Sequence, residues 1–302
     1  MYLGGGTNLV DLMKLGVETP ERLVDVSRLP HDAIEELPGG GLRIGGAVRN
    51  SDLAVHPVVR ERYPVLSQAL LAGASGQLRN LATVAGNLLQ RTRCSYFQDV
   101  TKPCNKRRPG SGCPAREGEH HNLAILGHSE HCVATHPSDM AVALAALGAT
   151  VHIHGTDGAR ALPMPGFHRL PGDDPARDTE LAPADLITSV ELAPADAASG
   201  HSSYRKVRER ASYSFAVVSV AAALDVREGI VEECRIALGG VAHVPWRAHQ
   251  AEAAIVGAPA TRETFAAGAV AELALAEPLR DNAYKVALTR NVLTATLEEL
   301  CA

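Results

Sequence analysis

Four of the six cysteines fall close together in the chain. They occur at residues 94, 104, 113 and 132, separated by nine, eight and eighteen residues, whereas Cys234 and Cys301 stand apart. Six cysteines among 302 residues are too few for a disulfide scaffold, so this grouping favours a metal centre. The close C-x2-4-C pairs of zinc ribbons and the C-x2-C-x2-C run of bacterial ferredoxins are both absent. An iron–sulfur cluster, a zinc ion and unligated thiols all remain open on spacing alone.

The segment around these cysteines is strongly basic. Between Arg91 and Gly118 there are seven Lys or Arg and two acidic residues, a net charge of +5. Cationic surroundings stabilise an anionic cluster held by four thiolates, and this favours the iron–sulfur interpretation. Five histidines between residues 120 and 136 could bind zinc, but histidine is a minority cluster ligand. Tyr96 and Phe97 beside the basic residues could suggest a nucleic-acid patch, which the overall charge of −5 disfavours.

Two glycine-containing motifs could approach a phosphate closely. The first is Gly4-Gly5-Gly6-Thr7-Asn8-Leu9, in which successive N–H groups and the Thr7 hydroxyl can cradle an anion. It has neither the Gly-Lys-Ser/Thr of a P-loop nor the G-x-G-x-x-G of a Rossmann fold. The second runs from residue 76 to 88 and contains Thr83, Gly86 and Asn87. Taken separately, each motif is better explained as an ordinary turn or connecting loop.

Two polar motifs lie further along the chain. Ser138 or Asp139 can cap the helix that follows them, or present a hydroxyl and a carboxylate to a cofactor. Alternation along a strand puts Tyr204, Lys206 and Arg208 on one face, which suits contacts with an anion or a ring. A solvated strand face is the alternative.

The composition describes an ordinary globular protein. Hydrophobic residues make up 46% of the chain and charged residues 21%, which disfavours disorder and a globally basic nucleic-acid binder. No uncharged apolar run reaches the length of a membrane span. The first residues also lack the basic and apolar regions of a signal peptide, so we expect a cytoplasmic protein or one exported with a partner.

Hydrophobic periodicity divides the chain into two parts. We expect alternating short strands and helices up to about residue 196, including strands at 42–48, 151–154 and 186–192 and a helix at 140–147. Residues 91–131 are expected to form a loop so long that it implies either a function or a cross-link that holds it in place. Residues 170–185 are typical of a surface loop. Beyond residue 200 we expect three strands (203–207, 216–226, 231–239) and then three helices (248–255, 261–275, 282–300).

Taken in order, these motifs resemble those of one family, the FAD-binding subunits of the molybdenum hydroxylases (the xanthine dehydrogenase superfamily). The series Gly-Gly-Thr-Asn-Leu, Gln-Leu-Arg-Asn…Ala-Gly-Asn-Leu, Pro-Ser-Asp and Tyr-Arg-Lys-Val-Arg spans nearly the whole chain. The cysteine segment resembles an insert of the bacterial periplasmic aldehyde oxidoreductase medium subunit, which carries an extra [4Fe–4S] cluster. A similar insert occurs in the flavin subunit of 4-hydroxybenzoyl-CoA reductase.

The resemblance implies an α+β fold. A two-part, vanillyl-alcohol-oxidase-like FAD-binding domain, not a Rossmann fold, is expected at 1–196 with an iron–sulfur insert at 91–132. A smaller domain with a three-stranded sheet and helices is expected at 201–302. By this likeness FAD is bound by Gly4, Gly5, Gly6, Thr7, Asn8, Leu9, Thr83, Gly86, Asn87, Ser138, Asp139 and Lys206. The cluster ligands are then Cys94, Cys104, Cys113 and Cys132, Cys234 and Cys301 are packing residues, and the chain supplies no catalytic residue.

The function implied is electron transfer within a complex. A large molybdenum-cofactor subunit would oxidise an aldehyde, a small [2Fe–2S] subunit would pass on the electrons, and this chain's FAD would deliver them to an external acceptor. The alternatives are a zinc-stabilised module without enzymatic activity, the flavin subunit of a related hydroxylase, or a stand-alone flavin oxidase. A periplasmic location is implied through a twin-arginine partner. The family has a strand–helix–strand segment before its Gly-Gly-Thr motif, whereas three residues precede Gly4 here, and FAD binding is expected to depend on that segment.

Overall fold

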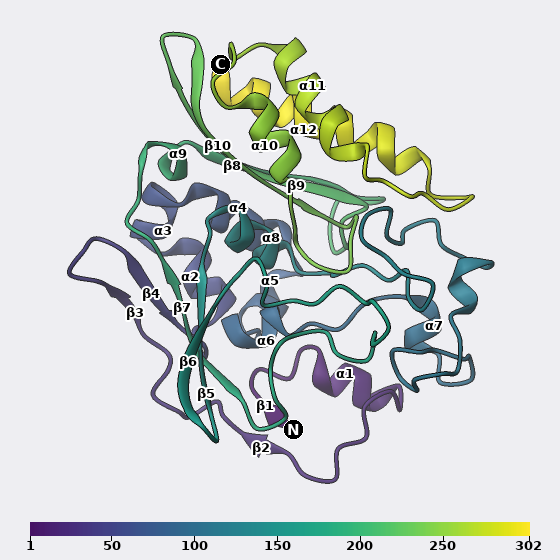
Figure 1. Cartoon of the computed structure of the whole chain (residues 1–302). Coiled ribbons are helices and arrows are strands. Elements are labelled where there is room, and N and C mark those ends of the chain that lie inside the picture. The colour runs from purple at the N-terminus through teal and green to yellow at the C-terminus, as the bar shows by residue number, and fades with distance from the viewer.

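The computed structural model describes residues 1–302 and contains two main sheets with helices between and outside them (Figure 1). The chain begins with a small parallel pair, β1 (Tyr2–Leu3) and β2 (Val24–Asp25), with α1 (Leu9–Lys14) between them. This pair lies at the lower end of the molecule in Figure 1, away from the C-terminal helices.

The N-terminal part is built on a five-stranded antiparallel sheet in the order β3-β4-β7-β5-β6. Alternation along β5 points Val151 and Ile153 into the core, and a register shift in the β5–β7 ladder lets both Ile187 and Val190 of β7 reach it. Polar side chains such as His152 and Arg43 lie on the other face, as expected for an antiparallel sheet covered on one side. The strands are β3 (Ile34–Glu36), β4 (Leu42–Gly45), β5 (Thr150–Gly155), β6 (Gly158–Pro163) and β7 (Leu186–Leu192).

Short helices cover the inner face of this sheet. Pro57 and Pro64 each stand at the first turn of a helix, where proline is tolerated, and they divide one helical region into three pieces. The fully buried α8, rich in alanine, packs against α4. The helices are α2 (Asn50–Val55), α3 (Pro57–Arg62), α4 (Pro64–Ala72), α5 (Gly76–Arg79), α6 (Val84–Leu88) and α8 (Asp139–Ala146).

The C-terminal sheet, ordered β11-β10-β9-β8, is buried on both faces. Ala221 of β9 belongs to the core shared with α4 and α8, whereas its neighbours Val220 and Ala222 belong to the core beneath the C-terminal helices. A strand covered on both sides reads as a continuous apolar run, and residues 220–224 do so. The strands are β8 (Ser202–Val207), β9 (Val218–Arg227), β10 (Ile230–Gly239) and β11 (Trp246–Arg247).

The C-terminal helices form the outer layer at the top of Figure 1. They are α10 (His249–Ile255), α11 (Arg262–Leu273) and α12 (Tyr284–Cys301), and the short α9 (Ala197–Gly200) precedes the sheet. None of the helices is long and apolar enough to span a bilayer.

The cysteine segment forms a long loop at one side of the molecule (Figure 1). Its regular structure is limited to α7 (Ser95–Gln98) and one 3-10 turn, Pro114–Arg116. A separate small core holds it together, centred on Phe97, Ala115 and Leu123. Side-chain packing, and not β-sheet hydrogen bonding between backbone groups, therefore holds this loop in place.

The expected α+β class is confirmed, and the helices and strands predicted after residue 200 are present. Three details differ from the expectation. The strand expected at 42–48 ends at Gly45. The two-residue β11 adds a fourth strand at the sheet edge, too short to give a periodic signal. The 170–185 segment contributes a buried contact through Asp178, so it is more than a surface loop.

Candidate functional site

The glycine loop lies directly against the chain at Leu81. A Cβ on Gly5 would stand 1.8 Å from the Leu81 carbonyl oxygen, and Gly6 adopts a φ of +74°. Glycine is therefore required at both positions, at one for space and at the other for backbone conformation. This contact holds the first glycine motif beside the second, 76–88, although they are far apart in the sequence.

The loop presents free backbone donors. None of the N–H groups from Gly4 to Asn8 donates a hydrogen bond within the chain. The side chain of Asn8 accepts a bond from the Arg91 amide (3.0 Å), which leaves its buried Nδ2 donor without a partner. A run of unpaired donors of this kind suits a phosphate group.

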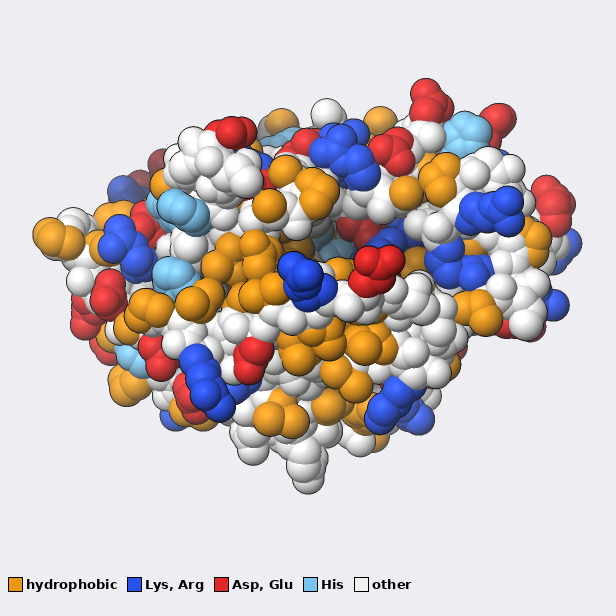
Figure 2. Space-filling model, turned by 90° about the horizontal axis from the view of Figure 1, so that it is seen from below, with side chains coloured by type: hydrophobic (Ala, Val, Ile, Leu, Met, Phe, Trp, Pro, Cys, Tyr) orange, Lys and Arg blue, Asp and Glu red, His pale blue; other side chains and the backbone are white.

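A continuous cleft opens on both sides of this loop. One lobe of about 290 Å³ has many apolar lining residues, among them Leu29, Leu181 and Ile187. The second lobe, of about 730 Å³, is more polar and lies between the two parts of the chain. Both lobes are lined by Gly6, Thr7, Asn8 and Gly86. Seen from below, the molecule has hydrophobic side chains gathered around a hollow in this face (Figure 2).

A buried ion pair forms one wall of the larger lobe. The Lys206 Nζ lies 2.8 Å from Asp139 Oδ2, and both side chains are more than nine-tenths buried. Asp139 also accepts a hydrogen bond from the Tyr204 hydroxyl. Burial, followed by the Asp139 charge, raises the pKa of Tyr204 well above its ordinary value. The tyrosine thus remains a hydrogen-bond donor at any physiological pH.

The remaining residues that were predicted to bind FAD line one of the two lobes or support a residue that does. Thr83 caps α6 by accepting from the Gly86 amide (3.2 Å) and lines the smaller lobe, as does Leu9. Ser138 caps α8 by accepting from the Ala141 amide (2.9 Å), and its hydroxyl donates to Asn87 Oδ1. Ser138 thus lies behind Asn87, which lines the larger lobe.

The four clustered cysteines line one pocket, about 10 Å³ in volume, although they stand well apart along the loop. Burial raises the pKa of the Cys94 and Cys113 thiols, and it raises that of Cys132 to about 12. These three thiols are therefore protonated in the metal-free chain. No group of three His, Cys, Asp or Glu converges closely enough to hold a single metal ion.

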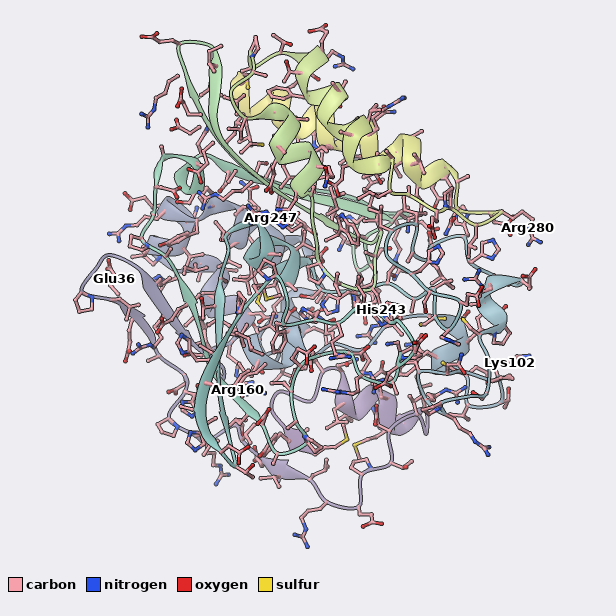
Figure 3. The ribbon with its side chains drawn as sticks, in the orientation of Figure 1. Glu36, Lys102, Arg160, His243, Arg247 and Arg280 are labelled. Atoms are coloured by element: carbon pink, nitrogen blue, oxygen red, sulfur yellow. The ribbon has the colours of Figure 1, made fainter.

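A buried lysine anchors the cysteine loop to the body of the protein. Lys106 Nζ, fully enclosed, contacts Asp178 Oδ1 and lies 2.7 Å from His243 Nε2. Asp178 Oδ2 lies 2.6 Å from the Arg91 guanidinium. Burial raises the pKa of Asp178, but His243, Lys106 and Arg91 outweigh this and hold it far below its ordinary value. Figure 3 shows His243 in the interior and Lys102 at the outer edge of the loop.

Sequence reasoning missed this anchor and part of the cleft wall. Arg93 and Phe215 line the larger lobe and stack 4.8 Å apart. Asp178 lay in a polar, proline-rich stretch without periodicity, so nothing in the sequence paired it with Lys106. Arg107, one of the basic residues of the cysteine segment, bonds to carbonyls of Tyr96 and Asp99 within the loop.

Comparison with known proteins defines the class. The family described as the FAD binding domain in molybdopterin dehydrogenase matches residues 1–195, and the CO dehydrogenase flavoprotein C-terminal domain matches 202–300. The chain belongs to the FAD-binding medium subunits of the molybdenum hydroxylase family.

Individual relatives make the comparison more specific. The chain is 52% identical to the aldehyde oxidoreductase FAD-binding subunit PaoB of Escherichia coli over 300 residues, covering 99% of this chain and 90% of that protein. It is 25% identical to the glyceraldehyde dehydrogenase medium chain of Sulfolobus acidocaldarius over 84% of this chain and 73% of that one. Carbon monoxide dehydrogenase from Hydrogenophaga pseudoflava has a matching structure, with a TM-score of 0.76, 27% identity, and coverage of 100% of this chain and 90% of that chain.

The cleft fits the FAD that this family binds. The unpaired donors of Gly4 to Asn8 and the buried Asn8 Nδ2 suit a pyrophosphate, and the two lobes leave room on either side of it. FAD is thereby supported as the cofactor.

Proposed function

We propose that this chain is the electron-transfer flavin subunit of a molybdenum-containing aldehyde oxidoreductase. The observation that carries the proposal is the single cleft that runs from the glycine loop to the buried Lys206–Asp139 pair. The relative with 52% identity is named for aldehyde oxidation, which supports an aldehyde as the substrate of the complex. The chain itself contributes no catalytic residue to that oxidation.

The residues of the cleft have distinct roles in this proposal. The amides of Gly4 to Asn8 bind the pyrophosphate, and Leu9 and Thr83 close the loop around it. Gly86, Asn87 and Ser138 shape the passage between the lobes, with Asn87 oriented by the Ser138 hydroxyl. Lys206 holds positive charge against the larger lobe and is itself fixed by Asp139. FAD, when bound, supplies an acceptor for electrons that arrive singly and leave in pairs.

Cys94, Cys104, Cys113 and Cys132 are proposed to hold a [4Fe–4S] cluster. The pocket that they share, with Lys106 nearby as a buried cation, supports this set. A cluster bound there supplies a one-electron carrier and cross-links the loop. Binding of the cluster should therefore release protons from the cysteines, because thiols must deprotonate to bind iron.

The proposal extends to the organisation of the complex. Residues 1–196 form the FAD-binding domain, with the insert at 91–132, and 201–302 form the second domain. A large molybdenum-cofactor subunit and a small [2Fe–2S] subunit are the partners, and an external acceptor receives the electrons. Export to the periplasm would then depend on a twin-arginine signal carried by a partner.

Purification of the complex tests this function. We expect a yellow-brown protein that copurifies with molybdenum and [2Fe–2S] chains, releases FAD on heating and reduces a dye when given an aldehyde. A colourless chain that contains zinc and no flavin would contradict the proposal and favour an interaction module. Aldehyde-independent oxidase activity of the chain alone would contradict it in favour of a stand-alone oxidase.

A further inference from the structure

Two buried histidines pack against each other behind the flavin cleft, with their rings tilted by 55°. The rings of His136 and His168 lie 4.2 Å apart between centroids, and each residue is at least nine-tenths buried. His168 Nε2 lies 2.9 Å from the Leu88 carbonyl oxygen, at the end of the second glycine motif. His136 Nε2 and His168 Nδ1 have no hydrogen-bond partner. Two unpaired buried nitrogens in one pair are unusual and call for a ligand or a function.

A small cavity lies between His136 and the cleft wall. Its volume is about 30 Å³, and it is lined by His136 and by Ser219, whose buried Oγ is also without a partner. A polar cavity of this size accommodates one ordered water that would bridge the two groups. The cavity shares the lining residues Arg93, Pro137, Asp139 and Phe215 with the larger lobe, so it opens directly behind the cleft wall.

The strand register completes a chain of polar atoms. On the β8–β9 ladder Ser219 pairs with Lys206, and Tyr204 is two residues away on the same face. The Tyr204 hydroxyl donates to Asp139, which bonds to Lys206 at the wall of the lobe. Tyr204 and Ser219 therefore share one face of the sheet, and Asp139, the partner of Tyr204, lines the cavity together with Ser219 and His136.

The charges facing the histidine pair leave it uncharged at neutral pH. Burial, reinforced by His168, lowers the pKa of His136 well below its ordinary value, and burial lowers that of His168 to about 4. His243 and Lys106 oppose protonation of His136, and Asp178 favours it. Asp178 is itself neutralised by Lys106 and Arg91. The pair is thus unprotonated, and its ability to bind a proton depends on the charge of its surroundings.

We propose that His136 and His168 form a proton-accepting site coupled to the electron load of the flavin cleft, reached through Ser219 and a water in the adjoining cavity. Added electrons make the cleft more negative, and His136 Nε2 then binds a proton from solvent to become an imidazolium. The N–H bond breaks again when the electrons leave for the external acceptor, and the proton returns to solvent. This inference rests on the proposed flavin function, which supplies the electrons.

Proton counting on the intact complex tests the proposal. The complex is reduced anaerobically by photoreduction in weak buffer at pH 7, and proton uptake per flavin is followed with an indicator dye. We expect His136→Gln to take up fewer protons than the native complex, with a loss of about one per flavin. The control His154→Gln changes an exposed histidine on β5 and should leave the count unchanged. Equal uptake by the native and His136→Gln complexes would overturn the proposal.

A second variant covers the case in which His136→Gln does not fold. Ser219→Ala removes one unpaired oxygen and should preserve the proton count while slowing the uptake severalfold in stopped-flow records. Unchanged uptake rates in Ser219→Ala would contradict the path. The flavin content of each complex is measured first, from the FAD released on heating. A complex without flavin would contradict the proposed function. Full flavin content with equal proton uptake by the native and His136→Gln complexes would contradict this inference alone.

Discussion

The glycine loop and the cysteine loop are held in place by opposite means. The glycine loop is held by direct contact between backbone groups, because Gly5 packs against the Leu81 carbonyl. The amides of Gly4 to Asn8 remain free to bind a ligand. At the cysteine loop regular structure is sparse, and buried side chains such as Lys106 make the connections. A site for phosphate is thus made by exposing amides, whereas a site for metal is made by converging side chains. Mutations should therefore separate the two sites.

Gly5→Ala should give the largest loss at the flavin site. The added Cβ would stand 1.8 Å from the Leu81 oxygen, so the loop must shift. Overpacking of this kind costs about 2 kcal/mol or more, which corresponds to FAD affinity weakened roughly tenfold or more. Flavin per chain, from heat release, measures this. Gly39→Ala is the matched control, because a Cβ there meets nothing within 4 Å. Full flavin in Gly5→Ala would contradict the tight-contact argument.

Lys106→Met should act on the cysteine loop instead. Removal of this buried cation leaves Asp178 with Arg91 and His243 only, and breaking such pairs costs about 3 kcal/mol. We expect a lower unfolding temperature and a reduced iron content, with flavin largely retained. Lys102→Met, at the exposed outer edge of the same loop (Figure 3), should behave as the native chain does. Equal losses in both lysine variants would remove the distinction between the two loops.

His168 should make the stability of the chain depend on pH. Its pKa is lowered from 6.5 to about 4 by burial, so the unfolded state binds the proton more tightly. The stabilisation is present above pH 6.5 and is lost as the pH falls towards 4, by up to about 3 kcal/mol. Urea unfolding at a series of pH values measures it. His168→Gln should flatten the dependence, and identical slopes for both chains would show that the histidine is not neutral when folded.

Tyr204→Phe should have the smallest effect. It removes one hydroxyl and its hydrogen bond to Asp139 but leaves the Lys206–Asp139 pair. A single hydrogen bond contributes about 1 kcal/mol. We expect a slightly lower unfolding temperature with flavin content unchanged. A loss of flavin comparable to that of Gly5→Ala would mean that the hydroxyl, and not the glycine loop, governs binding.

The same contrast explains what the sequence could reveal. Residues such as Gly5, Thr83 and Asp139 lie in motifs whose order is specific, so this part of the cleft lining could be predicted from the sequence, whereas Arg93 and Phe215 could not. Strands and helices after residue 196 follow from periodicity. The Lys106–Asp178 contact joins residues 72 apart, and the His136–His168 pair depends on how two loops fold back. Such pairings leave no local pattern, because each residue alone resembles an ordinary polar loop residue.

Iron and flavin measured together in the purified complex test the central claim, that one chain holds FAD and a four-cysteine cluster at separate sites. We predict that Cys104→Ser lowers iron by about four atoms per chain and removes part of the broad visible absorbance, while FAD stays at the native level. Cys301→Ser, at an exposed position, should leave both unchanged. Native iron content in Cys104→Ser would contradict the account.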